Sequence, residues 1–209
     1  MCRVHKPQAI RRRIIEDYFA QHDLRHGVYA VTGVGEFVPS SLSRVYRGLM
    51  QLMDEGLIGR DATFLDAGSG DGRVVVLTSF VLDLMSYGVE YDETLWQRSL
   101  TNINFFRRFY QDAAHLPMVL WGDFCDEETY TRFGMRFTVF DVVFDYASNH
   151  HKLAQKITRD AKDDVLFVYY GPNAFAESFS GLCAIRSLSL GNPCASTQSF
   201  LHVYRKQRP

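Results

Sequence analysis

A glycine-rich turn is the part of this sequence whose residue types and spacing point most clearly to chemistry. Residues 64–73 have the sequence Phe-Leu-Asp-Ala-Gly-Ser-Gly-Asp-Gly-Arg. Glycines allow the backbone to turn tightly and let a ligand approach without a Cβ in the way. Counted from Gly68 and Gly70, the third glycine of a dinucleotide-binding turn would fall at Arg73, and the lysine of a phosphate loop is missing. The turn therefore favours a different ligand.

Acidic residues at the ends of three predicted strands indicate what that ligand is. Asp66 precedes the first glycine, where a carboxylate suits the amino or sulfonium end of S-adenosylmethionine. Glu90 ends the next strand and can accept hydrogen bonds from two ribose hydroxyls. Asp123 and Phe124 follow the third strand, in place for the amino group and the face of adenine. We therefore predict S-adenosylmethionine as cofactor, bound by Asp66, Gly68, Ser69, Gly70, Gly72, Arg73, Glu90, Asp123 and Phe124. The alternative is a glycine turn that only packs a strand against a helix.

The elements that must position these residues alternate regularly along the chain. Short apolar segments predict strands at 63–67, 87–91, 118–121, 138–144 and 164–170. Helical spacing of apolar residues predicts helices at 10–22, 42–56, 74–85, 93–110, 126–133 and 149–160, with an irregular loop over 28–39. Segments 183–190 and 199–204 flank Gly191-Asn192-Pro193 and predict a closing hairpin.

This alternation predicts an α/β fold with a Rossmann-like, seven-stranded, mostly parallel sheet. Helices should cover both faces, and a C-terminal antiparallel β-hairpin should complete the sheet. We expect residues 1–60 to form a helical and loop segment that covers the cofactor site. Residues 61–209 should form the S-adenosylmethionine-binding methyltransferase domain.

Composition excludes several classes of protein. The chain has 209 residues, a formal net charge of -1 and a pI near 6.6, which argues against a nucleic-acid partner. Four scattered cysteines and no apolar run of membrane-spanning length favour a cytoplasmic protein without a membrane partner. No metal site is expected: His150-His151 lacks an evident third ligand and is interpreted as a solvated pair.

The motifs resemble those of seven-strand S-adenosylmethionine methyltransferases over roughly residues 28–206. Within that class the chain is most similar to the lysine methyltransferases of the nucleosome core, the disruptor-of-telomeric-silencing type. The matching segments are Gly35-Glu36-Phe37-x-Pro39-Ser40, residues 64–75, Tyr87-Gly-Val-Glu90, Gly122-Asp123-Phe124 and Ser199-Phe-Leu-His-Val203. The resemblance implies that Glu36 lies over the cofactor. Val34 and Arg73 depart from the family pattern, and no long basic extension is present. A similar plan is found in methyltransferases that act on lysines of non-histone proteins, so the preferred acceptor is a protein lysine with its target left open.

Transfer to a lysine requires a neutral amine placed opposite the methyl group. Tyr146, Tyr170 and Phe200 are candidates for an aromatic channel that desolvates the amine, and Asp145 with Tyr146 is the candidate catalytic pair. A carboxylate at Asp145 would favour the charged ammonium unless it receives the proton. A small-molecule N- or O-methyltransferase and a non-catalytic cofactor-binding module remain alternatives. The acceptor is expected to be a protein or a small molecule.

Overall fold

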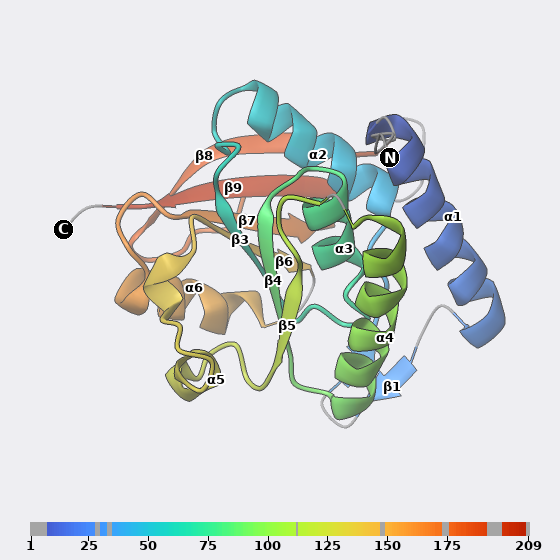
Figure 1. The fold of residues 1–209 in the computed structure, drawn as a ribbon. Coiled ribbons are helices and arrows are strands. Elements are labelled where there is room, and N and C mark those ends of the chain that lie inside the picture. Colours follow the sequence, from blue (N-terminus) through green and yellow to red (C-terminus); the bar gives the residue numbers. More distant parts are fainter. Residues whose placement is uncertain are drawn as a thin grey trace.

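A seven-stranded sheet forms the centre of the molecule. The computed structural model describes residues 8–27, 30–32, 35–111, 113–146, 149–172, 176–191 and 198–207. The strand order is β5-β4-β3-β6-β7-β9-β8, with β9 antiparallel to both of its neighbours and the others parallel (Figure 1). The strands are β3 (Thr63–Ala67), β4 (Met85–Glu90), β5 (Met118–Trp121), β6 (Val142–Tyr146), β7 (Leu166–Gly171), β8 (Leu182–Ser189) and β9 (Phe200–Lys206). The predicted fold and closing hairpin are confirmed.

Helices cover both faces of this sheet and bury a separate apolar core on each. One core includes residues of α1 (Gln8–His26), α2 (Leu42–Asp54), α3 (Arg73–Phe80) and α4 (Glu93–Phe109). The other core includes α5 (Glu127–Thr131) and α6 (His150–Asp160). Side chains alternate between the two along each strand, so Val142 and Phe144 enter the first core and Val143 enters the second. No helix among the described residues is long and apolar enough to cross a membrane.

The helix after the glycine turn is shorter than predicted. It ends at Phe80 rather than at Met85, and Met85 begins β4. Asp83 adopts a left-handed backbone conformation with φ of 56°, which an α-helix cannot accommodate. Val81, Leu82 and Leu84 are nevertheless buried, and this continuous apolar run explains the overestimate.

The strand predicted at 138–144 is also displaced. Phe137–Val139 forms a 3₁₀ turn, and β6 spans Val142–Tyr146. Phe137 and Phe140 both pack into the second core. Residues three apart share a side in a 3₁₀ turn but take opposite sides of a strand, so burying both rings favours the turn. The shift makes Asp145 and Tyr146 the last two residues of β6.

The segment predicted as an irregular loop at 28–39 contains a small hairpin. Strands β1 (Ala30–Thr32) and β2 (Gly35–Phe37) pair antiparallel, with Val31 opposite Glu36. This pairing places Glu36 in β2 rather than in an unstructured loop. The described residues before β3 thus form two helices and a hairpin.

Candidate functional site

The glycine turn joins β3 to α3 and is held by backbone hydrogen bonds. The N–H groups of Gly68 and Ser69 both donate to the carbonyl of Val89, at 2.9 Å. Gly70 and Gly72 have φ of 55° and 77°, which side chains with a Cβ rarely adopt. A methyl group at Gly70 would also clash with the ring of Phe37, and one at Gly72 would lie 2.9 Å from Ser99 Cβ. Both positions therefore require glycine.

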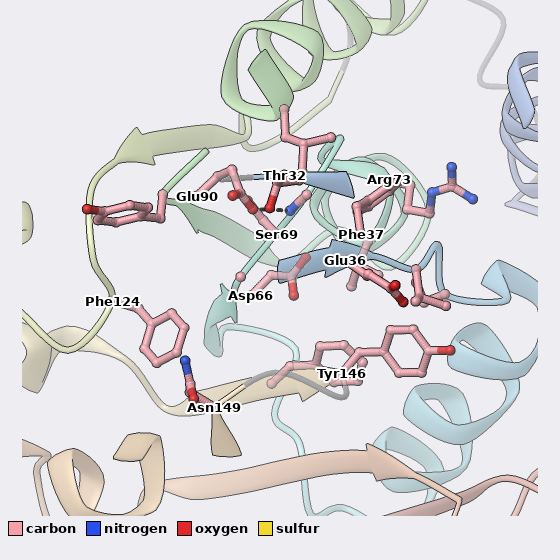
Figure 2. Close-up of a pocket in the computed structure, with 18 of the residues that line it drawn as sticks. Thr32, Glu36, Phe37, Asp66, Ser69, Arg73, Glu90, Phe124, Tyr146 and Asn149 are labelled. Carbon is pink, nitrogen blue, oxygen red and sulfur yellow. Dashed lines mark hydrogen bonds between the residues drawn. The ribbon is translucent and has the colours of Figure 1, made fainter. Parts of the chain in front are cut away.

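A cavity of about 540 Å³ opens beside this turn. Side chains from β2, β3, β4 and β6 border it (Figure 2). Its volume lies within the range of pockets that bind small molecules and cofactors. Ten of the residues predicted for the site line this cavity: Glu36, Asp66, Gly68, Ser69, Gly70, Arg73, Glu90, Asp123, Phe124 and Tyr146. The predicted residues Gly72, Asp145, Tyr170 and Phe200 are not among the lining residues.

Two buried carboxylates form the acidic centre of the cavity. Asp66 is 3% exposed and Glu90 is 6% exposed, at the ends of the paired strands β3 and β4. Burial, together with the charges of Asp145, Glu90 and Asp71, raises the pKa of Asp66 well above its ordinary value. Burial also raises the pKa of Glu90, although hydrogen bonds from the backbone N–H groups of Asp92 and Gly70 oppose the rise. This centre should attract a cationic ligand.

Glu90 connects the turn to the start of α4. Its Oε2 accepts a hydrogen bond from Gly70 N at 2.7 Å, and its Oε1 accepts one from Asp92 N at 2.8 Å. These bonds fix the orientation of the carboxylate at the cavity wall. At the end of β5, Asp123 Oδ1 accepts a hydrogen bond from Cys125 N at 2.7 Å. Both carboxylates are thus held in place by the backbone beside the cavity.

The guanidinium of Arg73 is engaged on the side of the turn that faces α1. It donates to both carboxylate oxygens of Asp71 and to both of Asp23, at 2.7–3.0 Å. Burial by itself would lower the pKa of Arg73, but these hydrogen bonds outweigh it and the pKa is raised. The Arg73 side chain is only 6% exposed. Arg73 therefore connects the turn to α1 through its guanidinium, and the residue also borders the cavity.

The end of β6 separates the two predicted catalytic residues. Tyr146 and Phe144 line the cavity, whereas Asp145 between them points to the opposite face of the sheet and is fully buried. The Tyr146 ring lies against that of Tyr170, with centroids 4.7 Å apart. Phe200, the third predicted channel residue, stacks on His202 and is not among the lining residues. Of the three predicted channel residues, Tyr146 lines the cavity, whereas Tyr170 and Phe200 do not.

Several lining residues were not predicted from the sequence. Thr32, Phe37, Val38 and Ser40 come from the segment before β3, and Asn149 and Lys152 come from the start of α6. Phe37 and Ser40 belong to the same motif as Glu36, so the resemblance carried a signal for them. Asn149 and Lys152 carry no chemical signature in the sequence. They reach the cavity because parallel strands bring the helices that follow them to one edge of the sheet.

His150 and His151 have a third potential ligand that sequence reasoning did not find. The carboxylate of Glu177 lies within 3.4 Å of the Nε2 atoms of both histidines. Glu177 is in the connection after β7, far from the histidines in the chain. The interpretation of the pair as solvated is wrong for His150, whose side chain is only 18% exposed.

Comparisons with known proteins were made by family, sequence and structure. No family model matches this chain, and no curated protein sequence matches it. Among solved structures, an RNA methyltransferase from Salinibacter ruber in complex with S-adenosyl-L-homocysteine has a TM-score of 0.56 at 19% identity, over 82% of this chain and 97% of that one. A variant of MtNAS in complex with S-adenosylmethionine has a TM-score of 0.60 at 13% identity, over 96% of this chain and 72% of that one.

A third structure covers nearly the whole of both chains. A candidate sarcosine dimethylglycine methyltransferase from Galdieria sulphuraria has a TM-score of 0.57 at 13% identity, over 94% of this chain and 98% of that one. These structures give no support to the narrower resemblance to lysine methyltransferases. At such identities the likeness establishes the fold alone. The chain has the Rossmann-like methyltransferase fold, a seven-stranded sheet closed by an antiparallel hairpin.

Proposed function

We propose that this chain is an S-adenosylmethionine-dependent methyltransferase. The observation that carries the proposal is the pair of buried carboxylates, Asp66 and Glu90, on the wall of a 540 Å³ cavity beside a turn that requires glycine. Buried charges are costly unless they are paired. S-adenosylmethionine carries an ammonium and a sulfonium, and its positive charge would reduce the repulsion among these acids. The neighbouring structures with S-adenosylhomocysteine or S-adenosylmethionine bound support the same cofactor.

The residues around the cavity fit the parts of that cofactor in order along the sheet. Glu90 at the end of β4 would accept hydrogen bonds from the ribose hydroxyls. Asp123 and Phe124 after β5 would bind the adenine amino group and face. Asp66, with Glu36 of β2, would hold the amino-acid end. The absence of a side chain at Gly68 allows the ligand to approach the backbone, whereas the corresponding space at Gly70 is taken by the Phe37 ring.

For the methyl acceptor we propose an amine, and a protein lysine as its form. The sequence resemblance and the aromatic pair Tyr146 and Tyr170 support this choice. At pH 7 a lysine with a pKa of about 10.4 resists deprotonation by roughly 4.6 kcal/mol. An aromatic wall that excludes water lowers the pKa of the amine and reduces that cost. Methyl transfer would then depend mainly on holding the nitrogen in line with the reacting bond.

Tyr146 and Asp145 would have different roles in this reaction. Tyr146 borders the cavity and is placed to contact the acceptor. Asp145 is fully buried on the other face of β6, and its charge raises the pKa of Asp66. We therefore assign Tyr146 to the acceptor and propose that Asp145 acts through Asp66 as a positioning residue.

The test uses S-adenosylmethionine labelled on its methyl group. The purified protein is incubated with a cell lysate separated into protein, RNA, DNA and small-molecule fractions, with Glu90→Gln as the binding-deficient control. We expect label in the protein fraction, recovered as methyllysine after hydrolysis, with the wild-type chain only. Label confined to RNA or to small molecules would contradict the lysine acceptor and leave methyl transfer standing.

Direct binding measurements separate the cofactor from the reaction. Isothermal titration calorimetry with S-adenosylmethionine should give one site per chain. Binding without label in any fraction would contradict the methyltransferase proposal and favour a module that binds the cofactor without catalysis. Asp145→Asn should change cofactor affinity, because Asp145 is proposed to act through Asp66; if neither affinity nor turnover changes, Asp145 has no part in the mechanism.

A further inference from the structure

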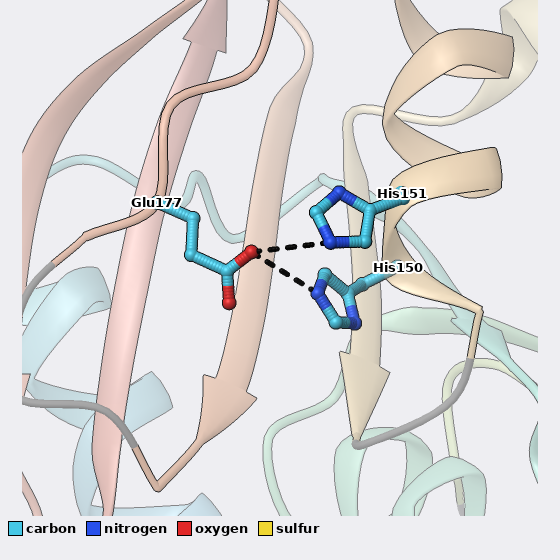
Figure 3. A group of neighbouring side chains, drawn as sticks. All are labelled: His150, His151 and Glu177. Atoms are coloured by element: carbon cyan, nitrogen blue, oxygen red, sulfur yellow. Dashed lines mark hydrogen bonds and ion pairs between the residues drawn. The ribbon is translucent and has the colours of Figure 1, made fainter.

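Three potential metal ligands meet where α6 begins. His150 and His151 are the first two residues of α6, and Glu177 lies in the connection between β7 and β8. The Nε2 atoms of His150 and His151 are 3.2 Å and 3.4 Å from the same Glu177 oxygen (Figure 3). All three donor atoms lie within 4.8 Å of one another. Two segments that are distant in the sequence therefore present three donor atoms to one point.

Aromatic side chains hold the two imidazoles in this arrangement. The His150 ring stacks on Tyr169 of β7, with centroids 4.5 Å apart. The Phe179 ring lies edge-on to both histidines, at 6.1 Å from His150 and 5.6 Å from His151. The side chains of His150 and Glu177 are 18% and 25% exposed, whereas that of His151 is 69% exposed. The cluster is thus packed on one side and open to solvent on the other.

We propose that His150, His151 and Glu177 bind a divalent transition metal ion, with zinc as the ion that fits best. Imidazole nitrogen and carboxylate oxygen are both ligands that zinc prefers. With three protein ligands, one coordination position stays open, as in zinc sites that bind a water or another ligand. The solvent-exposed side of His151 provides access for the ion. Nothing in the proposed methyl transfer uses this site, so the two proposals stand separately.

A second cluster that also combines histidine with carboxylates shows why composition alone does not suffice. His22, Asp23 and Asp71 also offer three donor atoms within 4.8 Å. Both aspartates, however, are already hydrogen-bonded to the guanidinium of Arg73. A metal ion there would have to displace or approach a buried positive charge. At the other cluster, the ion pairs described for the Glu177 carboxylate are those with His150 and His151 themselves.

Metal binding would stiffen one end of the cavity. His150 directly follows Asn149, which lines the cavity, and Glu177 follows the strand that carries Tyr170. An ion bridging His150, His151 and Glu177 would therefore cross-link the segments that follow β6 and β7. Strand β6 ends at Tyr146 and β7 carries Tyr170, and these two rings pack together with centroids 4.7 Å apart. The ion would thus join the chain beyond two strands that carry this aromatic pair.

The experiment measures metal binding directly, with no dependence on catalysis. Protein without a histidine tag is treated with a chelator and titrated with Co²⁺, whose visible absorption reports nitrogen and oxygen coordination; Zn²⁺ is then added in competition. We expect one equivalent bound by the wild-type chain. His151→Ala and Glu177→Gln should each weaken binding by about 100-fold, because the first removes a direct ligand and the second replaces a charged carboxylate with a neutral amide. His22→Ala is the matched control and should bind as the wild type does.

The outcomes decide the proposal in either direction. His151 is exposed, so His151→Ala should keep the fold, which circular dichroism checks. Glu177→Gln keeps the size of the side chain and removes only its charge. Failure of the wild-type chain to bind either ion would overturn the proposal. Loss of binding in His22→Ala but not in His151→Ala or Glu177→Gln would also overturn it and place the metal in the other cluster.

Discussion

At the scale of single residues, the site is governed by the proximity of buried acids. Asp66 is only 3% exposed and lies on β3, the strand beside the one that carries Glu90. Burial and the charges of Asp145, Glu90 and Asp71 all raise its pKa. Its carboxyl group therefore keeps its proton to a higher pH than an ordinary aspartate. A cationic ligand favours the ionised form and must drive that proton off when it binds. Ligand binding and proton release are thus linked at Asp66.

This linkage predicts that S-adenosylmethionine binds more tightly as the pH rises. Below the raised pKa of Asp66, each pH unit should change the affinity by up to about tenfold, because one proton leaves per ligand bound. Calorimetric titrations from about pH 5 to about pH 8 measure this slope. Asp66→Asn cannot lose a proton there and should show a flatter profile. An equal slope in wild type and Asp66→Asn would assign the proton to another group.

Glu90 is the residue whose replacement should weaken cofactor binding without disturbing the fold of the strand. In Glu90→Gln the amide keeps the shape of the side chain but places an NH₂ group where an acceptor is needed for Gly70 N or for a ribose hydroxyl. Loss of a hydrogen bond to a charged acceptor costs about 1.5–3 kcal/mol, which corresponds to roughly 10- to 150-fold in affinity. Glu93→Gln, an exposed change in the first turn of α4, is the control and should bind normally. Equal affinities in the two variants would remove Glu90 from the site.

At the scale of elements, Arg73 links the glycine turn to α1, two parts of the chain that are distant in the sequence. Asp71 belongs to the glycine turn and Asp23 to α1, and one buried guanidinium satisfies both. Asn102 of α4 donates to the carbonyl of Asp71 at 2.9 Å and accepts from Tyr18 of α1 at 2.8 Å. The turn is therefore held from two neighbouring helices as well as from the sheet.

Removing the guanidinium should destabilise the fold strongly. Arg73→Met leaves Asp71 buried without its partner, and breaking a buried pair in this way typically costs about 3–5 kcal/mol. Asp23→Asn should cost less, because Asp71 still pairs with Arg73. Arg13→Met on the same helix is the control: Arg13 is 84% exposed beside Asp17, and such pairs contribute roughly 0–1 kcal/mol. Urea unfolding gives the three free energies; an effect of Arg73→Met no larger than that of Arg13→Met would contradict this account.

Most of the elements could be predicted because their apolar patterns are local. The five parallel strands and the closing hairpin were predicted from short apolar segments between turn residues, and the two acids at the cavity from their place at strand ends. The end of α3 could not be predicted, since Asp83 breaks the helix inside an apolar run. The contact between Glu177 and His150 could not be predicted either, because only the tertiary fold brings the connection after β7 to the start of α6.

At the scale of the whole molecule, the fold shifts the pKa values of its acidic residues in opposite directions. Asp160, near the surface, is paired with cations, and hydrogen bonds from Arg159 and from Lys156 lower its pKa to about 2. The acids at the cavity behave in the opposite way, since burial raises the pKa of both Asp66 and Glu90. The lowered pKa of Asp160 favours the folded state above its ordinary value of 3.8, whereas the raised pKa values of Asp66 and Glu90 favour the folded state at lower pH. These shifts therefore contribute to the pH dependence of stability with opposite signs.

The last prediction concerns the free energy of unfolding of the ligand-free chain. Because Asp66 and Glu90 bind protons more tightly when folded than when unfolded, the folded state holds more protons, and stability should fall as the pH rises from their ordinary pKa values of 3.8 and 4.5 through the raised values. The contribution of Asp160 is already complete in that range, since its pKa is lowered in the folded state.

Urea unfolding between about pH 4.5 and about pH 7.5 measures this slope. Asp66→Asn removes the larger of the two contributions to this slope, so its stability should vary less with pH. Without ligand, this variant should also be more stable than the wild type at neutral pH. Saturating S-adenosylmethionine should flatten the wild-type profile in the same way, because its positive charge lets Asp66 ionise within the fold. A ligand-free stability that rises with pH over this range, in both proteins alike, would show that the acids at the cavity do not control the stability of the molecule.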